Sequence, residues 1–291
     1  MLTTFDARQW SEPFSESNQQ HAIQSLESGH LLHFPKLPFL LSPEEKRFLT
    51  PSVADPKSKN IGYHPETNKL WGVHQLTDEE RLQLKRMMQR YAHHALSLIQ
   101  NALPHYREHL IIGRTSYRPM EIVGRASSYR KDDKRLHVDA FPSSPNQGKR
   151  ILRVFSNINP HGQARVWRVG EPFEDVAKRF LPTIKKPFPG YATLLNLLGI
   201  TKTYRTHYDH YMLHLHDNMK ADMHYQETAP QETLALAANT SWIVQTDHVS
   251  HAAMQGQYLL EQTFYLPVEA MQNQNLSPLR VIERLTGQTL A

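Results

Sequence analysis

The sequence predicts a mainly β fold with helical additions: a double-stranded β-helix (jelly-roll) core flanked by N-terminal and C-terminal helices. Short extended runs separated by turn residues fill residues 105–270, a pattern typical of double-sheet β folds. Clear helix signals stand outside that region, at 77–103 and after Ser277. A chain of 291 residues is long enough to build one large core, so we expect one domain over 1–291.

We divide this expected domain into three regions. Residues 1–105 form a helix-containing N-terminal region, in which the capping box Thr77-Asp78-Glu79-Glu80 begins a long amphipathic helix that ends near Leu103. Residues 105–270 form the double-stranded β-helix catalytic core. Residues 271–291 hold a C-terminal helix that is capped by Ser277 and ends at Gly287.

The core region should contain nine short strands and one helix. The helix is expected at 173–181. The strands are expected at 109–112, 114–122, 136–141, 150–158, 165–169, 192–198, 242–246, 249–254 and 258–266. In the N-terminal region, the apolar segment 31–41 is interrupted by proline and predicts a core strand and turn. Its alternative role is docking to a membrane surface, which exposure of the segment would favour.

The amino-acid composition limits which kinds of site and which partners the chain can have. The chain has no cysteine, which excludes disulfides, thiolate metal sites and cysteine nucleophiles, so a bound metal must use His, Asp or Glu. No N-terminal signal and no apolar run of about 20 residues is visible, so a cytoplasmic location is expected. The net charge of +5 favours an anionic partner, but without a long basic run nucleic acid is not expected.

The candidate site begins with the triplet His137-Val138-Asp139. Residues two apart on a strand share a face, so this imidazole and carboxylate can hold one metal ion. The triplet alone is common by chance, but a distant histidine on another strand would complete a 2-His-1-carboxylate triad, typical of non-haem Fe(II) oxygenases. We favour His251, which shares a strand face with apolar neighbours; His248, closer to a turn, is the alternative third ligand.

The usual co-substrate at such a triad is 2-oxoglutarate, whose far carboxylate needs a buried cation. The strand 258–266, where that cation often lies, has no Lys or Arg. Arginine is the best partner because its planar fork binds a carboxylate through two hydrogen bonds. Within the predicted strands, the candidate arginines are Arg118, Arg153, Arg165 and Arg168, and Trp167 shares a face with Arg165.

Several long strings resemble the Kdo hydroxylase family, best between about 105 and 270. They are Ser116-Tyr117-Arg118-Pro119, His137-Val138-Asp139-Ala140-Phe141-Pro142, the runs 153–160 and 165–173, Val249-Ser250-His251-Ala252-Ala253-Met254, and Glu261-Gln262-Thr263-Phe264.

The resemblance implies an Fe(II)/2-oxoglutarate-dependent dioxygenase on a double-stranded β-helix. Its cofactors would be Fe(II), 2-oxoglutarate and O2, and it would hydroxylate C3 of 3-deoxy-D-manno-oct-2-ulosonic acid (Kdo) in the lipopolysaccharide inner core. Kdo-lipid A would become Ko-lipid A, with succinate and CO2 as co-products. His137, Asp139 and His251 would hold iron, and the 2-oxoglutarate site would be lined by Arg118, Arg153, Arg165 and Trp167.

This reading implies a lipid-linked acidic sugar as partner and a transient contact with the membrane surface. The enzyme would then be peripheral at the cytoplasmic face of the inner membrane. Two other readings stay open from the sequence: an iron oxygenase of the same fold with another anionic substrate, and a non-catalytic jelly-roll carbohydrate-binding module.

Two further segments are candidates for substrate contact. The charged run before the iron motif is first of all a solvated loop, but it could meet phosphates or a sugar carboxylate through Arg130, Lys131, Lys134 and Arg135. The histidine-dense run 207–217 places His210 and His214 at helical spacing without the glutamate of a zinc protease. We favour packing for these histidines, then substrate contact through His210, then a second metal.

Overall fold

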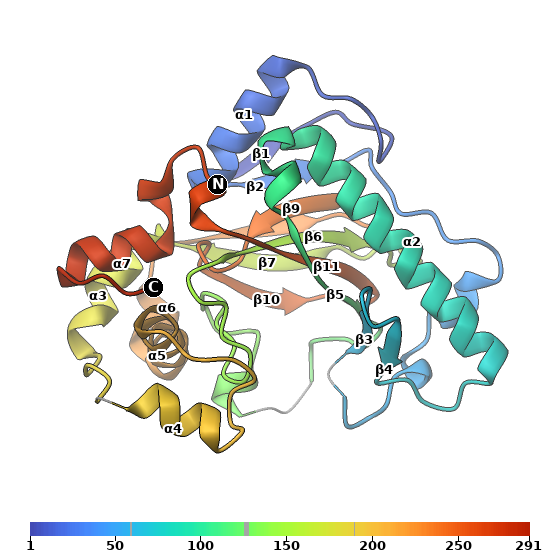
Figure 1. The fold of residues 1–291 in the computed structure, drawn as a ribbon. Coiled ribbons are helices and arrows are strands. Elements are labelled where there is room, and N and C mark those ends of the chain that lie inside the picture. Colours follow the sequence, from blue (N-terminus) through green and yellow to red (C-terminus); the bar gives the residue numbers. More distant parts are fainter. Residues whose placement is uncertain (59, 125–127, 189) are drawn as a thin grey trace.

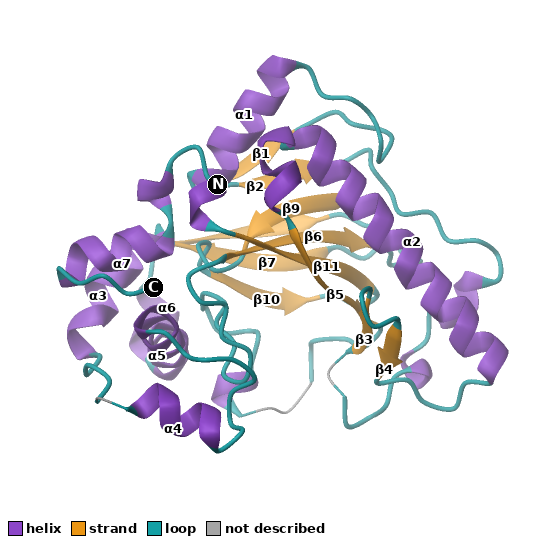
Figure 2. Ribbon diagram, in the orientation of Figure 1, coloured by secondary structure: helices purple, strands orange, loops and turns teal. Residues whose placement is uncertain are grey.

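The computed structural model describes residues 1–58, 60–124, 128–188 and 190–291. Figures 1 and 2 show the strands in the middle of the molecule, with helices α1 and α2 along one side and α3 to α7 grouped at the other end. The bounds of the helices are α1 Glu16–Glu27, α2 Asp78–Ala102, α3 Phe173–Phe180, α4 Tyr191–Leu197, α5 His207–Ala221, α6 Met223–Thr228 and α7 Pro278–Thr286.

The strands form two sheets. The larger has eight strands in the order β1 (Leu2–Thr4), β2 (Leu31–Phe34), β9 (Ser241–Gln245), β6 (Arg150–Asn157), β11 (Leu259–Leu266), β5 (Ile111–Arg118), β3 (Ile61–His64) and β4 (Lys69–Trp71). The smaller has the order β10 (His251–Gln255), β7 (Arg165–Gly170) and β8 (Gln231–Leu236). Neighbouring strands are antiparallel except for β1 and β2. Since β1 to β4 precede residue 105, the N-terminal region supplies half of the larger sheet.

The two sheets face each other across a small aromatic core. Phe155 and Trp242 of the larger sheet stack at a centroid distance of 5.3 Å, and Trp167 of the smaller sheet meets both rings edge-on. Aromatic pairs in these geometries add about 0.5–1.5 kcal/mol each beyond the area they bury. The functional pocket lies beside this core, so its walls come from both sheets and are held rigidly.

The predicted helices at both ends of the chain are confirmed. In α2, Thr77 and Glu80 form the expected capping box, and the apolar stripe that includes Leu84 and Tyr91 is buried. In α7, the Ser277 side chain accepts the Arg280 N–H, and Gly287 ends the helix at a φ of 65°, which favours glycine.

The segment 31–41 is mostly interior. Leu31, Leu32 and Phe34 are fully buried and lie on β2, next to β9, whereas Leu40 is exposed. This supports the core strand and gives no support to membrane docking by the segment. Among the described residues, the model has no helix that is both apolar enough and long enough to span a membrane.

The predicted strand at 192–198 is wrong, because residues 192–197 belong to helix α4 and Leu198 lies in the turn after it. Of the leucines there, Leu195 is buried but Leu197 and Leu198 are exposed, and this one-sided burial fits a surface helix rather than a core strand. The sequence also did not reveal strand β8 or helices α5 and α6, so the fold is a mixed α/β arrangement with more helix than expected.

Two strand predictions need smaller corrections. The two strands predicted at 109–112 and 114–122 are replaced by one strand, β5, which spans Ile111–Arg118. Gly113 is not a turn: a Cβ there would lie 2.9 Å from the Thr263 carbonyl oxygen of β11, where the register shifts. Residues 136–141 form no regular strand but one isolated bridge, between His137 and His251.

Candidate active site

Two chain segments carry the three candidate metal ligands. His137 and His251 are joined by reciprocal backbone hydrogen bonds of 3.0 and 2.9 Å, and the Asp139 N–H donates to the Thr246 carbonyl at 2.8 Å. Gln226 of α6 clamps the same segment, since its side chain accepts the Leu136 N–H and donates to the Leu136 carbonyl. A side-chain clamp thus takes the place of ladder bonds, which explains why 136–141 is not a strand.

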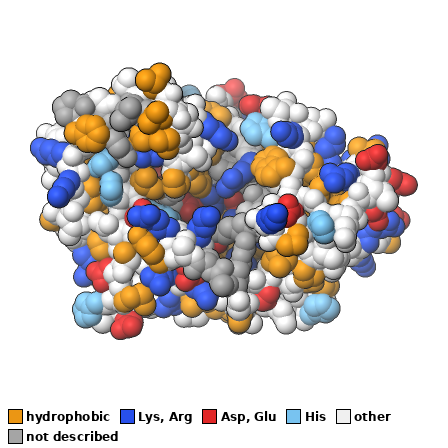
Figure 3. Space-filling model, turned by 90° about the horizontal axis from the view of Figure 1, so that it is seen from below, with side chains coloured by type: hydrophobic (Ala, Val, Ile, Leu, Met, Phe, Trp, Pro, Cys, Tyr) orange, Lys and Arg blue, Asp and Glu red, His pale blue; other side chains and the backbone are white. Residues whose placement is uncertain are grey.

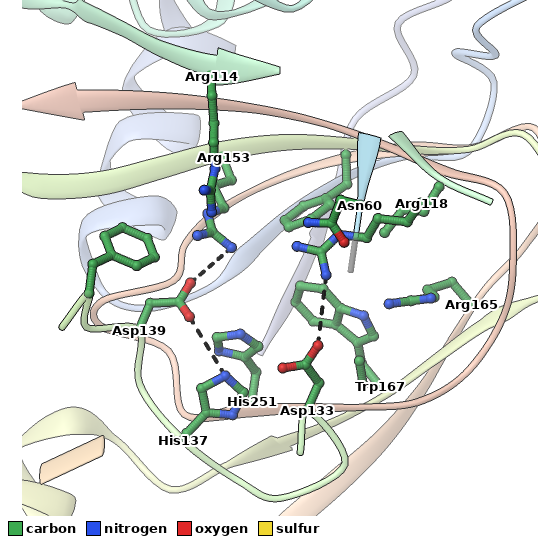
Figure 4. A pocket seen from close by; sticks show the side chains of 14 residues that line it. Asn60, Arg114, Arg118, Asp133, His137, Asp139, Arg153, Arg165, Trp167 and His251 are labelled. Atoms are coloured by element: carbon green, nitrogen blue, oxygen red, sulfur yellow. Dashed lines mark ion pairs between the residues drawn. The ribbon is translucent and has the colours of Figure 1, made fainter. Parts of the chain in front are cut away.

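The three ligand side chains converge. One atom each of His137, Asp139 and His251 lies within 4.8 Å of the others, and these residues are the one such His/Asp/Glu group among the described residues. The His137 Nε2 atom is 3.6 Å from Asp139 Oδ1. Figure 4 shows the imidazoles and the carboxylate pointing toward one another.

Hydrogen bonds fix which nitrogen of each imidazole is free. The Nδ1 atom of His137 lies 2.7 Å from the Arg135 carbonyl oxygen, and that of His251 lies 2.8 Å from the Val249 carbonyl oxygen. A carbonyl only accepts, so both Nδ1 atoms donate and both Nε2 atoms keep a lone pair. Such outer partners orient metal-binding histidines and set their tautomers.

The protonation states also suit a metal. Burial, with Lys220 nearby, lowers the pKa of His137 to about 3, and burial also lowers the pKa of His251. Burial alone would raise the pKa of Asp139, but Arg153 and His137 outweigh it and hold that pKa well below its usual range. Near neutral pH the site offers two neutral imidazoles and a carboxylate, the forms that bind metal.

The ligands open into a cationic cavity of about 120 Å³ between the two sheets. Four arginines face two aspartates in its lining, so the cavity has an excess of positive charge suited to an anion. The lining residues are Asn60, Arg114, Arg118, Asp133, His137, Asp139, Phe141, Arg153, Phe155, Arg165, Trp167, His251, Ala253 and Leu259.

Two of these arginines are tied to protein carboxylates. Arg153 Nη1 lies 2.9 Å from Asp139 Oδ2, and Arg153 Nε lies 3.5 Å from Glu261 Oε1. Arg118 Nε donates to Glu261 Oε2 at 3.1 Å. Glu261 is fully buried, and although burial raises its pKa, Arg118 and Arg153 outweigh that effect and lower it to about 2. Glu261 therefore links both arginines to the candidate ligand Asp139.

Arg165 and Trp167 of β7 differ from this pair. Arg165 Nη1 donates to the Gly256 carbonyl at 2.8 Å, but its buried Nε and the buried Trp167 Nε1 have no hydrogen-bond partner among the described residues. Burial and the nearby Arg118 lower the pKa of Arg165 to about 9, so it stays cationic at neutral pH. The Trp167 ring stacks on His251 at 5.1 Å. The Nε atom of Arg153 is also buried without a hydrogen-bond partner among the described residues, and three such donors on residues that line the cavity fit a bound carboxylate.

The other sequence candidates lie outside the cavity lining. His248 is buried against Phe173, at a centroid distance of 5.9 Å, away from the three converging ligands. In the charged run, Arg130 pairs with Asp217 and Arg135 with Asp132, while Lys131 and Lys134 also stay outside the lining. His210 on α5 bonds through Nε2 to the Lys185 carbonyl.

Sequence reasoning missed several residues at the site. Arg114 lies four residues before Arg118 on β5, a spacing that puts both on one face, so the strand period could have found it. Glu261 is a lone charge in an apolar strand, which is a signal for burial with a partner. His216, whose ring meets His137 edge-on at 5.3 Å, lies in the histidine-dense run 207–217, but nothing there set it apart from its neighbours. Asn60 gave no local signal.

Two imidazoles and one carboxylate around a buried position, beside a cationic cavity, are the features of a non-haem Fe(II) oxygenase site. Comparison with known families makes the assignment specific. The profile of the 3-deoxy-D-manno-oct-2-ulosonic acid (Kdo) hydroxylases matches residues 9–289, so the chain belongs to the Kdo hydroxylase family. The family and the enzyme class predicted from the sequence are confirmed.

Solved structures agree. Kdo hydroxylase KdoO, a non-heme Fe(II) alphaketoglutarate dependent dioxygenase, in complex with alphaketoglutarate and Fe(III), is 48% identical, with a TM-score of 0.96 and coverage of 100% of this chain and 97% of that one. The cobalt(II) complex is 49% identical (TM-score 0.97; coverage 99% and 97%), and the complex with succinate and Fe(III) is 48% identical (TM-score 0.95; coverage 99% and 97%). A search among curated proteins found no match.

Proposed function

We propose that this chain is an Fe(II)/2-oxoglutarate-dependent dioxygenase that hydroxylates C3 of Kdo in the lipopolysaccharide inner core. It would convert Kdo-lipid A to Ko-lipid A. The observation that carries this proposal is the buried convergence of His137, Asp139 and His251 at one end of an arginine-rich cavity. Membership of the Kdo hydroxylase family supports the substrate.

The donor set fits iron rather than a hard cation. Two imidazole nitrogens and one carboxylate oxygen leave open positions, whereas Mg²⁺ or Ca²⁺ would favour oxygen donors throughout. When bound, iron would activate O2, which is the oxidant, and 2-oxoglutarate would supply two electrons as it is converted to succinate and CO2. His251 is the third ligand in this proposal, because His248 lies against Phe173.

The protein's own residues bind and orient the co-substrate. Arg165 and Trp167 would receive the far carboxylate of 2-oxoglutarate. Both keep a buried donor without a hydrogen-bond partner among the described residues, and Arg165, unlike Arg118 and Arg153, is paired with no carboxylate among them. Arg153 and Arg118 would complete the positive wall of the cavity, held in place by Glu261. Because Arg153 also contacts Asp139, it would keep that ligand aimed at the metal.

We further propose that the two facing sheets form a double-stranded β-helix core, since both sheets contribute walls to one cavity between them. The chain would be a single domain over 1–291, with an N-terminal region 1–105, a core 105–270 and a C-terminal helix in 271–291. The single domain is supported by the strands β1 to β4, which the N-terminal region adds to the same sheet as the core.

The acidic sugar would be presented on a lipid. The enzyme would therefore work in the cytoplasm, in peripheral contact with the cytoplasmic face of the inner membrane. Contacts to sugar or phosphate remain a proposal for Arg130, Lys131, Lys134, Arg135 and His210. The first four flank Asp133, which lines the cavity, and this position supports their role.

Succinate formation tests the proposal. Purified protein is loaded with Fe(II) without oxygen, and 2-oxoglutarate, O2 and Kdo-lipid A are then added. We expect succinate in step with a one-oxygen gain in the mass of the sugar, both lost in Asp139→Ala. Succinate without sugar oxidation would keep the enzyme class and exclude this substrate. Bound iron without any succinate would favour a non-catalytic binding module.

A further inference from the structure

The described residues of 184–204, which are 184–188 and 190–204 and include α4, expose large apolar side chains to solvent. The exposed fraction is 81% for Leu197, 62% for Leu198, 53% for Ile200 and 52% for Tyr204. Single exposed apolar residues are ordinary, but a contiguous group of them marks an interaction site. The four lie within eight positions of one another in the sequence, on α4 and the segment that follows it, and are treated together as the apolar patch.

The segment holds these side chains outward through its own backbone. Leu195 is buried and anchors α4, Gly199 follows the helix at a φ of 66°, and the Ile200 N–H donates to the Leu195 carbonyl at 3.0 Å. These bonds form a helix end with a left-handed glycine. The exposed leucines therefore project from an ordered turn, and nothing in the anchoring contacts requires them to be apolar.

The charge of this segment favours an anionic lipid surface over a protein as its partner. Lys185, Lys186 and Lys202 are exposed on the same segment, and the sequence has no Asp or Glu from 184 to 208. An apolar patch whose own segment carries only positive charge has the composition of a surface that lies on anionic lipid. A protein partner would have to supply a matching acidic rim.

The segment is also tied to the site. The Lys202 N–H donates to the Ser143 carbonyl at 3.0 Å, and the Arg205 side chain donates to the Pro142 carbonyl. These acceptors directly follow Phe141, which lines the cavity, and Asp139. Figure 3 shows the face that carries α4: hydrophobic side chains gather on one side of it, and the centre is hollowed.

We propose that residues 184–188 and 190–204 provide the surface through which the enzyme docks on the anionic membrane that carries its substrate. This inference rests on the proposed function, because a lipid-linked sugar has to be reached at a membrane. Leu197, Leu198 and Ile200 enter the interface between headgroups and acyl chains, and the three lysines lie against the headgroups. The loop 141–147 then connects the docked segment to the cavity.

Binding to vesicles tests the proposal. The full chain is sedimented with mixed phosphatidylethanolamine–phosphatidylglycerol vesicles and with pure phosphatidylcholine vesicles. We expect binding to the anionic vesicles, weakened at least about tenfold in L197S/L198S through lost apolar insertion. We expect a loss of about fivefold for each lysine in K185Q and K186Q, which salt should reproduce. Leu40→Ser removes an equally exposed leucine elsewhere, and it should bind like the wild type.

Other outcomes would overturn the proposal. Equal binding of L197S/L198S and the wild type to anionic vesicles would exclude this surface. A change of oligomeric state in L197S/L198S, with vesicle binding intact, would assign the patch to a second copy of the chain. The proposed function is tested apart from docking, with a water-soluble Kdo oligosaccharide: failure of the wild type to oxidise it would count against the function, while the vesicle result would still decide the docking surface.

Discussion

Replacing Glu261 with glutamine should destabilise the protein strongly, although the two side chains have nearly the same size. Glu261 is fully buried, and two buried or half-buried arginines compensate its charge. Its pKa of about 2, against an ordinary value of 4.5, corresponds to roughly 3 kcal/mol of stabilisation of the charged form. This value agrees with the cost of about 3–5 kcal/mol in stability that follows when a buried ion pair is broken by removing one partner.

The assay is urea unfolding of the wild type and Glu261→Gln across a pH series. For a chain of this length, a loss of roughly 3 kcal/mol in the free energy of unfolding would lower the Tm of thermal unfolding by about 5 °C. Because the pKa of Glu261 is lower in the folded chain than in the unfolded one, this stabilisation is complete above pH 4.5 and is lost as the pH falls toward about 2. The gap between wild type and variant should therefore close within that window.

Two further variants make the result decisive. Glu174→Gln removes an exposed glutamate that pairs with Lys178 and Arg284, and it should cost less than about 1 kcal/mol. Adding Arg118→Met to Glu261→Gln should recover part of the loss, because it removes one uncompensated cation. A Glu261→Gln cost no larger than that of Glu174→Gln, or a gap unchanged by pH, would refute the reasoning.

Other expected outcomes follow from the same geometry. Iron analysis after anaerobic loading should find His251→Ala depleted of iron and His248→Ala fully loaded. The loss of iron affinity in His251→Ala should exceed the roughly 10–100-fold loss that follows removal of a residue hydrogen-bonded to a ligand. Equal iron content in the two variants would reopen the choice of ligand. Arg165→Met should raise the KM for 2-oxoglutarate by about thirtyfold or more, while Arg168→Met, on the same strand but outside the cavity lining, should leave it unchanged. A larger effect of Arg168→Met than of Arg165→Met would assign the carboxylate to Arg168 instead. Gly256→Ala should lower the free energy of unfolding in urea by about 1–3 kcal/mol, because Gly256 has a φ of 121°. It should also weaken 2-oxoglutarate binding, because the new Cβ would lie 2.9 Å from Arg165 Cδ. Wild-type values for both would show that this turn can relax.

Periodic and capping signals predicted those parts of the fold that local chemistry determines. The helix after Thr77 and the helix between Ser277 and Gly287 follow from side chains that satisfy the free N–H groups and a glycine that allows a left-handed end. The run 192–198 was misread because its leucines look like a core strand by composition. Their burial on one side only is a tertiary property that the sequence does not display.

In the candidate site too, some residues could be predicted from local sequence spacing and others could not. The strand period predicted that Arg165 and Trp167 share a face and that His137 and Asp139 point the same way. The structure places all four in one cavity, although His137 takes part only in an isolated bridge and not in a strand. Glu261 and His216 reach the site only through sheet pairing and the packing of α5, contacts between residues far apart in the sequence. One sequence without homologues carries no signal for such contacts.

The origin of the oxygen atoms tests the central claim most directly. Iron-loaded protein is given 2-oxoglutarate, Kdo-lipid A and oxygen gas enriched in a heavy isotope, and both products are analysed by mass. The account predicts one labelled oxygen in the succinate and one on C3 of the sugar, in equal amounts, with neither in Asp139→Ala. Hydroxylated sugar without the label, or labelled succinate with unchanged Kdo, would contradict it.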